Sequence, residues 1–254
     1  RIMAQIKVPS FLFLLSRQTI WVVVGSMWIG STFLTILYFQ IINSLPSDVA
    51  PLIKTMMLAL SSLVFCLSFV LIGAFFATIG RSGEIEGKFP RSPSHPIYAL
   101  RRFYGSAWSQ IYYFKPLYSL FLSVPLLKTV LFKSFGLKGN TEFTVYPDSW
   151  IRDLPLLKIG RGAYLANRCT VGTNVCMNDG SILVGRCEFG DNALVGHLAI
   201  FGLGCKLGDR SEIGIGAALG IRVRIGNESQ IAPNASLYHG VESGNQVKVG
   251  ACAF

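Results

Sequence analysis

His197 is the residue of this chain best placed for proton transfer. It lies in the segment Val195-Gly-His-Leu-Ala-Ile, two residues after an apolar position that we expect to point inward, so its imidazole should project outward. Histidine takes up and returns a proton near neutral pH. Asp179 lies eighteen residues earlier, and a carboxylate stacked beneath an imidazole can fix its tautomer and favour its protonated form. The pair predicts that His197 is a general base. The alternative interpretation is a surface His–Asp pair without a catalytic role.

A second candidate base is His239, in Leu237-Tyr-His-Gly. It lies forty-two residues after His197, so the two histidines should occupy different faces of one chain. The residues expected beneath it are Ile221, Leu203 and Gly185, none of which offers a polar side chain. Packing against Tyr238 or a place in an interface is the alternative interpretation of His239.

Three basic residues could hold an anionic donor. Arg222, Arg224 and Lys248 follow His197 in the chain, and guanidinium and ammonium groups bind phosphates well. A solvated basic face is the alternative. Turn formation explains the asparagines Asn174, Asn178 and Asn192, which tolerate left-handed conformations.

The element that must position these residues is a six-residue repeat from Ile159 to Phe254. Its first position is apolar in fifteen of sixteen cases, the next is glycine in eleven, and the residue four places on is always Ala, Cys, Ser or Val. This periodicity is typical of a parallel β-helix. Three hexads would form one coil of eighteen residues, which puts Asp179 under His197 and Arg161 under Asp179. We predict a continuous left-handed solenoid of about five coils, about 4.8 Å apart, without helices or antiparallel sheet between Val171 and Ile231.

Three cysteines follow the same eighteen-residue spacing. Cys169, Cys187 and Cys205 occupy the small-residue position, so we expect them to stack on one edge as core residues. A thiolate metal site is the alternative, but the paired C-x₂-C spacing of zinc ligands is missing. The sequence therefore predicts no metal site.

The N-terminal part is that of a membrane protein. The chain has a mean hydropathy of +0.49 and only 14% charged residues. Two stretches without charge run from about Thr19 to Ile42 and from about Thr55 to Ile79, and each is long enough for a helix of about 20 residues to cross a bilayer. We predict a transmembrane hairpin that turns at Ser44–Pro51. Two buried helices of a soluble protein, or a cleaved signal peptide, fit this length and composition less well.

Basic residues predict the orientation of this hairpin. Arg1, Lys7 and Arg17 precede the first span, five bases from Arg81 to Arg102 follow the second, and the connecting loop carries Lys54 alone. Excess positive charge marks the cytoplasmic side, so both ends and the solenoid should be cytoplasmic.

The connector between the membrane and the solenoid is rich in aromatic and basic residues. We expect it to form amphipathic helices in the headgroup region, with their rings at the interface and their bases on anionic lipid. The net charge of +10 fits a lipid bilayer as partner, whereas no nucleic-acid recognition motif accompanies the bases. The aromatic residues are Tyr98, Phe103, Tyr104, Trp108, Tyr112, Tyr113, Phe114, Tyr118 and Phe121.

The hexads resemble those of the hexapeptide-repeat acyltransferase superfamily. The order of hairpin, connector, the stretch Phe135-Gly-Leu-Lys-Gly-Asn-Thr-Glu-Phe and the stretch Asp153-Leu-Pro-Leu-Leu-Lys-Ile-Gly further resembles the membrane-embedded C-terminal domains of ε-poly-L-lysine synthetase-like proteins. This resemblance implies acyl or aminoacyl transfer from acyl-CoA or carrier-bound phosphopantetheine, by tandem domains of a nonribosomal peptide synthetase-like protein. It gives His197 the role of the base, although Leu198 stands where many such enzymes have an acid.

Together these patterns predict a membrane helical hairpin over 1–94, interfacial helices and a connector over 95–150, and an all-β left-handed β-helix over 151–254. The favoured function is a transferase, as a homo-oligomer or one of several tandem domains. A non-catalytic scaffold at the membrane is the main alternative. A zinc enzyme like the hexapeptide-fold carbonic anhydrases would need three clustered histidines. Because Phe254 falls in mid-coil without a cap, we expect a longer natural chain.

Overall fold

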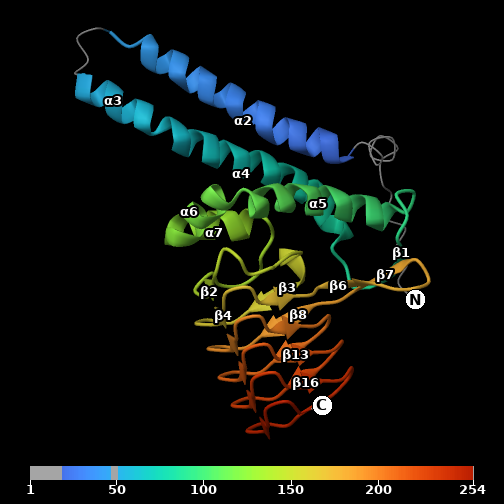
Figure 1. Cartoon of the computed structure of the whole chain (residues 1–254). Coiled ribbons are helices and arrows are strands. Elements are labelled where there is room, and N and C mark those ends of the chain that lie inside the picture. Colours follow the sequence, from blue (N-terminus) through green and yellow to red (C-terminus); the bar gives the residue numbers. More distant parts are fainter. Residues whose placement is uncertain (1–18, 47–50, 254) are drawn as a thin grey trace.

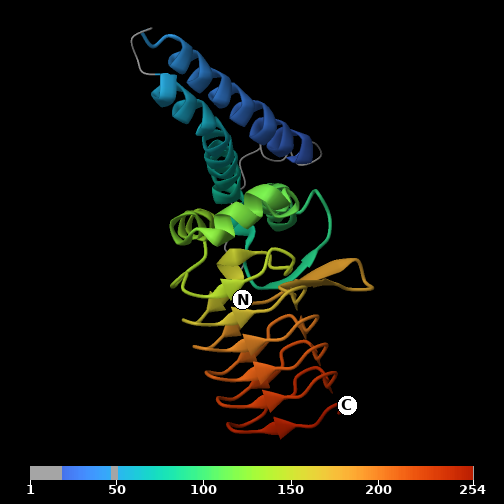
Figure 2. The same ribbon diagram turned by 60° about the vertical axis from the view of Figure 1, so that its left-hand side comes forward.

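The computed structural model describes residues 19–46 and 51–253, and it stacks three parts in chain order. A helical hairpin lies at one end, a layer of shorter helices lies in the middle, and a β-solenoid forms the other end (Figure 1). Turning the molecule shows the same order, with the solenoid coils stacked away from the helices (Figure 2).

The hairpin consists of α2 (Thr19–Asn43), α3 (Pro51–Ala59) and α4 (Ser61–Gly80). In the described residues two segments are long and apolar enough to cross a membrane, Ile20–Asn43 and Pro51–Gly83. At about 1.5 Å per residue, the first alone is roughly 36 Å long, which exceeds the ~30 Å hydrocarbon core. Both spans predicted from the sequence are therefore present as helices. The bases Arg1, Lys7 and Arg17 lie outside the described residues, as does the tip of the turn at 47–50.

Large apolar side chains on this hairpin face outward. Trp21 is 78% exposed, Ile29 73%, Leu52 70% and Phe75 63%. An exposed apolar surface of this kind is typical of contact with lipid rather than water. Helices α6 (Lys115–Ser123) and α7 (Pro125–Ser134) form a pair bent by 115°, which would make a third span if it crossed as one broken unit.

Helix α5 (Pro96–Tyr113) packs between the hairpin and the solenoid. Its close approach to α4 depends on Gly80, where a Cβ atom would stand 2.5 Å from the backbone nitrogen of Tyr104. The prediction that the connector's rings lie at the lipid interface is wrong for most of them, because they fill the protein core instead. The buried rings are Phe103, Tyr104, Trp108, Tyr112, Tyr118 and Phe121.

The solenoid has three parallel sheets, one for each side of the coil. One sheet contains β3 (Leu157–Ile159), β8 (Cys187–Phe189), β11 (Lys206–Leu207) and β14 (Arg224–Ile225). The second contains β5 (Thr170–Val171), β10 (Ile200–Phe201), β13 (Ala218–Leu219) and β16 (Ser236–Leu237). The third contains β2 (Thr144–Val145), β4 (Tyr164–Leu165), β9 (Leu194–Val195), β12 (Glu212–Ile213), β15 (Gln230–Ile231) and β17 (Lys248–Val249). We call them the β8, β10 and β9 sheets.

From β8 onward the parallel register advances by eighteen residues, as the hexads predict. Glu212 pairs with Gln230, and Gln230 pairs with Lys248. These parallel sheets fit a left-handed β-helix. The parallel pairing begins earlier than the hexad pattern, because Thr144 of β2 pairs with Tyr164. This first coil holds twenty residues instead of eighteen, and it contains the 3₁₀ turn η2 (Leu154–Leu156), which lies just before the first hexad.

One coil contradicts the prediction of an uninterrupted solenoid. Tyr164 pairs with Leu194, thirty residues later, so this coil holds twelve residues more than each of the eighteen-residue coils that follow it. The extra residues form an antiparallel hairpin of β6 (Asn174–Cys176) and β7 (Ser181–Val184), to which β1 (Gly87–Pro90) adds a third strand. The hairpin projects sideways from the solenoid (Figure 2). An insertion of two whole hexads leaves the sequence period unbroken, which is why the pattern did not reveal it.

This insertion also corrects the predicted cysteine stack. Cys187 and Cys205 lie in neighbouring coils of the β8 sheet, where the Glu188 nitrogen bonds the Cys205 carbonyl oxygen. Cys169 lies at a different corner, beside Ala199 and not beside Cys187. All three thiols are buried, and burial raises the pKa of Cys169 and Cys205 to about 11.

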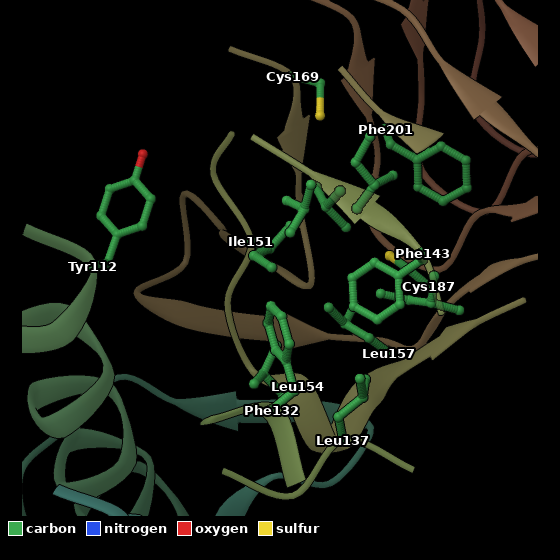
Figure 3. Close-up of a cluster of buried hydrophobic side chains, with 14 of the residues drawn as sticks. Tyr112, Phe132, Leu137, Phe143, Ile151, Leu154, Leu157, Cys169, Cys187 and Phe201 are labelled. Carbon is green, nitrogen blue, oxygen red and sulfur yellow. The ribbon is translucent and has the colours of Figure 1, made fainter. Parts of the chain in front are cut away.

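The helical layer closes the near end of the solenoid core. The ring centroids of Phe132 in α7 and Phe143 lie 5.2 Å apart, and Leu154, Leu157 and Phe201 belong to the same buried cluster (Figure 3). Exposed apolar residues at a solenoid end need such a cover. The α5–α7 layer thus joins the α2–α4 hairpin to the solenoid through one continuous core.

Candidate functional site

His197 lies on a corner of the solenoid, between β9 and β10. It is exposed and lines a shallow cavity of about 280 Å³, together with Tyr164, Glu212, Ile215 and Pro233. Within the described part of the chain, no side chain hydrogen bonds to its imidazole, and its fixed contact is the carbonyl oxygen, which accepts a bond from the Gly216 nitrogen at 2.8 Å. Both ring nitrogens can therefore meet a ligand.

The surface around His197 is apolar. Leu194, Leu198, Ile200 and Ile215 are exposed by 38%, 57%, 51% and 53%. Leu198 also has a φ angle of 59°, a left-handed conformation that polar residues adopt at most other such positions in the described chain. A large apolar residue in this position, turned to solvent, indicates a surface that contacts an apolar ligand or another chain.

The predicted partner of His197 is not beneath it. The hairpin insertion places Asn167 in the coil below, where its carbonyl oxygen accepts a hydrogen bond from Leu198. Asp179 lies in the turn of the β6–β7 hairpin and forms an ion pair with Lys88 at 2.5 Å. The Lys88 ammonium, with the hydroxyl and amide of Ser181, holds the pKa of the Asp179 carboxyl well below its usual range. The stacked His–Asp column is wrong, because thirty residues and not eighteen separate these two coils.

His239 lies above Ile221, as predicted, but its ring is not without a partner. The Ile221 backbone nitrogen donates a hydrogen bond to Nδ1 at 2.8 Å. A neutral ring that accepts through Nδ1 carries its proton on Nε2, so neither nitrogen is free to act as a base. Asn227 and Asn245 bridge successive coils at another corner in the same way, with a side-chain oxygen accepting from the backbone of the coil before. This contact makes His239 a structural coil-to-coil link.

The three residues predicted to bind the acyl donor lie in two different places. Arg222 and Arg224 line a cavity of about 490 Å³ on the β8 sheet, to which Arg186 and Lys206 also contribute, beside the base of the projecting hairpin. Arg224 pairs with Glu242 at 3.4 Å, whereas no ion pair of Arg222 occurs among the described residues. Lys248 lies on β17 of the β9 sheet, outside this cavity. The structure thus brings Arg222 and Arg224 together and leaves Lys248 apart.

A buried ionic cluster joins the three parts of the molecule and was missed in the sequence. Arg101 of α5 bonds Glu84 at the end of the hairpin and, through Nη2 at 2.6 Å, the Asp153 carboxylate beside η2. The three side chains are 3%, 0% and 0% exposed. One signal pointed to it, because Arg101 falls on the same helical face as Tyr104 and Trp108, where an apolar residue is expected.

Asp153 is the centre of this cluster. Its carboxylate also accepts hydrogen bonds from Thr173 at 2.7 Å, from Asn174 at 3.0 Å and from Arg152 Nε at 3.1 Å. Burial alone would raise the pKa of Asp153, but Arg152, Arg101 and the hydrogen bonds outweigh it and hold the pKa below its usual value. Asp153 is therefore a buried anion that is fully paired.

Glu84 differs from Asp153 in its surroundings. Its Oε1 atom is buried without a hydrogen-bond partner. Burial raises the pKa of Glu84 well above its usual range, and the neighbouring Asp153 charge adds to this rise, while Arg101 offsets part of it. A carboxyl in this position favours its protonated form more than Asp153 does. In the described residues no cluster of three or more His, Cys, Asp or Glu side chains could hold a metal ion.

No family model and no curated protein matches this chain. Among solved structures it is similar to serine acetyltransferase (CysE) of Neisseria gonorrhoeae, with 16% identity over 96% of this chain and 94% of that one and a TM-score of 0.30. It is also similar to the acetyltransferase domain of PglB from the same organism, bound to acetyl coenzyme A, with 16% identity, 47% and 62% coverage and a TM-score of 0.27.

A mutant of GDP-perosamine N-acetyltransferase from Caulobacter crescentus, in complex with CoA and GDP-perosamine, is a third similar structure, with 17% identity over 50% of this chain and a TM-score of 0.21. The chain spans 57% of that protein's length. Identities and TM-scores this low do not carry an activity or a substrate from these structures to this chain.

Proposed function

We propose that this chain is a membrane-anchored acyl or aminoacyl transferase domain of the hexapeptide-repeat type, with His197 as its general base. The observation that carries this proposal is the exposed His197 imidazole, which lines a cavity and is held by no side chain of the described structure. His239 offers no comparable group, because Nδ1 is bound to the backbone. The first experiment is therefore a transfer assay on the His197→Ala variant, with His239→Ala beside it.

The proposed reaction joins a thioester donor to an acceptor amine or hydroxyl. An imidazole nitrogen of His197 removes the proton as the acceptor attacks the thioester carbonyl carbon, so the new C–N or C–O bond forms and the C–S bond breaks. The imidazolium then gives its proton to the departing thiolate. The products are an amide or ester and a free thiol, and the neutral imidazole is restored.

The donor in this proposal is acyl-CoA or carrier-bound phosphopantetheine, whose phosphates would bind Arg222 and Arg224. Arginine suits phosphate oxygens because its N–H donors are fixed in a fork. Arg222 and His197 lie at opposite edges of the β10 sheet, since Arg222 follows β13 and His197 precedes β10, and Arg224 lies on β14 of the adjoining β8 sheet. A long, flexible pantetheine arm lying across this sheet would bring the thioester to His197.

Arg222→Gln should raise KM for the thioester donor about tenfold with little change in kcat, because a charge-assisted hydrogen bond to the bound donor is lost. Steady-state kinetics with acetyl-CoA and an acceptor panel, following the released thiol, measures this. Lys248→Gln is the matched control and should leave KM unchanged, since Lys248 lies outside the Arg222 cavity. An equal rise in KM for both variants would contradict a phosphate site at Arg222.

The proposal places the solenoid on the cytoplasmic side of a two-span hairpin. Cys176 and Cys252 are exposed on the solenoid and serve as native probes. An impermeant thiol reagent should label them only after cells are opened, whereas Ser44→Cys at the exposed end of α2 should be labelled in intact cells. Ser44→Cys is tested in a variant with both native probes replaced by alanine. Labelling of Cys252 in intact cells would reverse the orientation.

A non-catalytic scaffold remains the second candidate, and the apolar surface around His197 favours it. Leu198, Ile200 and Ile215 form a surface suited to another copy of the chain or to a tandem hexapeptide domain. This alternative predicts that His197→Ala changes neither activity nor assembly. Disrupting the core at Phe201 would then abolish partner binding, measured by size-exclusion chromatography with light scattering.

A further inference from the structure

A pocket at the junction of α2 and α5 has the composition of a lipid headgroup site. It has a volume of about 260 Å³, and its walls come from the start of α2, from one side of α5 and from the loop before η2. Liquid water occupies about 30 Å³ per molecule, so the pocket holds a phosphate and a few attached atoms but no acyl chain. It is separate from both His197 and the Arg222 cavity.

The α5 wall of this pocket is polar and basic. Arg102, Ser106 and Ser109 are spaced four and three residues apart, so they share one face of the helix, and Gln110 lies beside them. The Gln110 side-chain oxygen accepts a hydrogen bond from Trp28 Nε1 at 3.2 Å, which leaves its amide N–H groups as donors. No carboxylate lines the pocket among the residues described.

Arg152, from the loop before η2, adds a second basic group to the pocket beside α5. Its Nε atom is held by Asp153 at 3.1 Å, and the side chain is 29% exposed. Its Nη2 atom lies against Gly105, where a Cβ atom would stand only 2.5 Å away. Glycine at this point lets the guanidinium lie along α5. The group is thus fixed at one end by a buried carboxylate, and Arg152 and Gly105 both line the pocket.

The remaining wall is apolar and belongs to the first span. Ile20 and Val24 line it, and Ile20 and its neighbour Trp21 are 48% and 78% exposed. A ligand whose phosphate lies between the two arginines would therefore continue along the outer surface of α2. That combination of a phosphate with an apolar remainder is the chemistry of an anionic phospholipid.

We propose that this pocket binds the phosphate of an anionic phospholipid, with Arg102 and Arg152 pairing its charge, Ser106 and Ser109 donating hydrogen bonds, and α2 contacting the acyl chains. The inference rests on the membrane placement proposed above, but it does not depend on acyl transfer. A lipid bound here would fix α5, and through Arg152 and Asp153 the near end of the solenoid, against the membrane.

Thermal unfolding of the full chain in neutral detergent, titrated with phosphatidylglycerol, tests the proposal. We expect a saturable rise in Tm with phosphatidylglycerol and a much smaller one with phosphatidylcholine. Arg102→Gln combined with Ser106→Val should weaken phosphatidylglycerol binding at least about tenfold, because charge-assisted hydrogen bonds are lost while the Arg152–Asp153 pair is kept. Arg168→Gln, an equal charge change on an exposed solenoid turn, is the matched control.

Three results would overturn the assignment. Undiminished binding by the Arg102→Gln, Ser106→Val double variant would remove the site, and an equal loss with Arg168→Gln would show attraction to overall charge. Competition by inorganic phosphate at concentrations similar to the lipid would show a free-anion site. The lipid titration contains no acyl donor, so its result does not depend on whether the chain is active in the transfer assay. Conversely, a failure to bind phosphatidylglycerol does not bear on His197, which is tested by the transfer assay on His197→Ala.

Discussion

Replacing His197 with alanine is expected to lower the rate of acyl transfer by about 10²–10⁴-fold, the usual loss when a general base is removed. The fold should survive, because His197 is exposed and, within residues 19–46 and 51–253, its hydrogen bond is made by its backbone carbonyl. The measurement is thiol release from acetyl-CoA in the presence of amine and hydroxyl acceptors, at saturating donor. The loss should appear in kcat and diminish as pH rises, because hydroxide and a more basic acceptor partly replace the base.

Two controls separate this result from a structural effect. His239→Ala should leave kcat nearly unchanged, although it removes the hydrogen bond to the Ile221 nitrogen and lowers the Tm. Asp179→Asn should also be silent, because Asp179 pairs with Lys88 in the hairpin and not with His197. Full product formation by the His197→Ala variant would favour the scaffold over the transferase.

The second large effect is expected at Asp153. Asp153→Asn should lower the free energy of unfolding by about 3–5 kcal/mol, because it leaves the buried Arg101 guanidinium with Glu84 alone, whose raised pKa favours the neutral form. Thermal unfolding in detergent, followed by tryptophan fluorescence, reports this change, since Trp108 is buried in the same core. A loss below about 1 kcal/mol would mean that the cluster is not a paired charge network.

Glu84→Gln is the matched control for Asp153→Asn. Glu84 is equally buried, but its raised pKa means that the protein holds it closer to the neutral form, which glutamine resembles. We therefore expect a clearly smaller loss than for Asp153→Asn. Equal losses for the two variants would show that both carboxyls are ionised in the folded state.

The pKa shifts of Asp153 and Glu84 predict opposite pH dependences of the folding stability. The pKa of Asp153 is depressed on folding, so its contribution to stability is present above its ordinary pKa and is lost as the pH falls through the lower folded value. The pKa of Glu84 is raised, so the folded state holds a proton that the unfolded state releases above about pH 4.3, and stability declines as pH rises from there. Glu84→Gln should flatten this decline.

The hexads predicted the solenoid because apolar residues such as Ile213 and Ile231 must face the core once in each side of a coil. The two spans could be predicted because each uncharged stretch is long enough to cross a bilayer as a helix. Neither signal depends on contacts between distant residues, which is why both could be predicted from local sequence alone.

The β6–β7 hairpin could not be recognised from the hexad pattern, and the reason is physical. Met177 and Leu183 fall at hexad positions, but in the hairpin the alternation of a strand applies, and Ile182 and Val184 are buried instead. The turn residues Asp179-Gly180 between Asn174–Cys176 and Ser181–Val184 are the signal that could have revealed it. The error in the site followed directly, because one misplaced coil moved Asp179 away from His197.

The buried cluster was hidden for another reason. Glu84, Arg101 and Asp153 are far apart in the chain, and nothing in the local sequence of any one identifies its partners. Only the packing of α5 between α4 and η2 brings them together. The lipid pocket likewise arises from α2, α5 and Arg152, so it too depends on the tertiary arrangement.

The pairing of β1 with β7 also determines the order in which the chain can fold during synthesis. Lys88 pairs with Leu183, so this sheet cannot close until almost a hundred further residues have left the ribosome. Each later coil, by contrast, needs only the coil before it and can add in turn. The sheet of β1, β7 and β6 therefore waits for one long-range closure, and contacts of such high sequence separation form slowly. Until then β1 lacks the strand it pairs with in this sheet, and unpaired strand edges of this kind are the ones that invite pairing with other nascent chains.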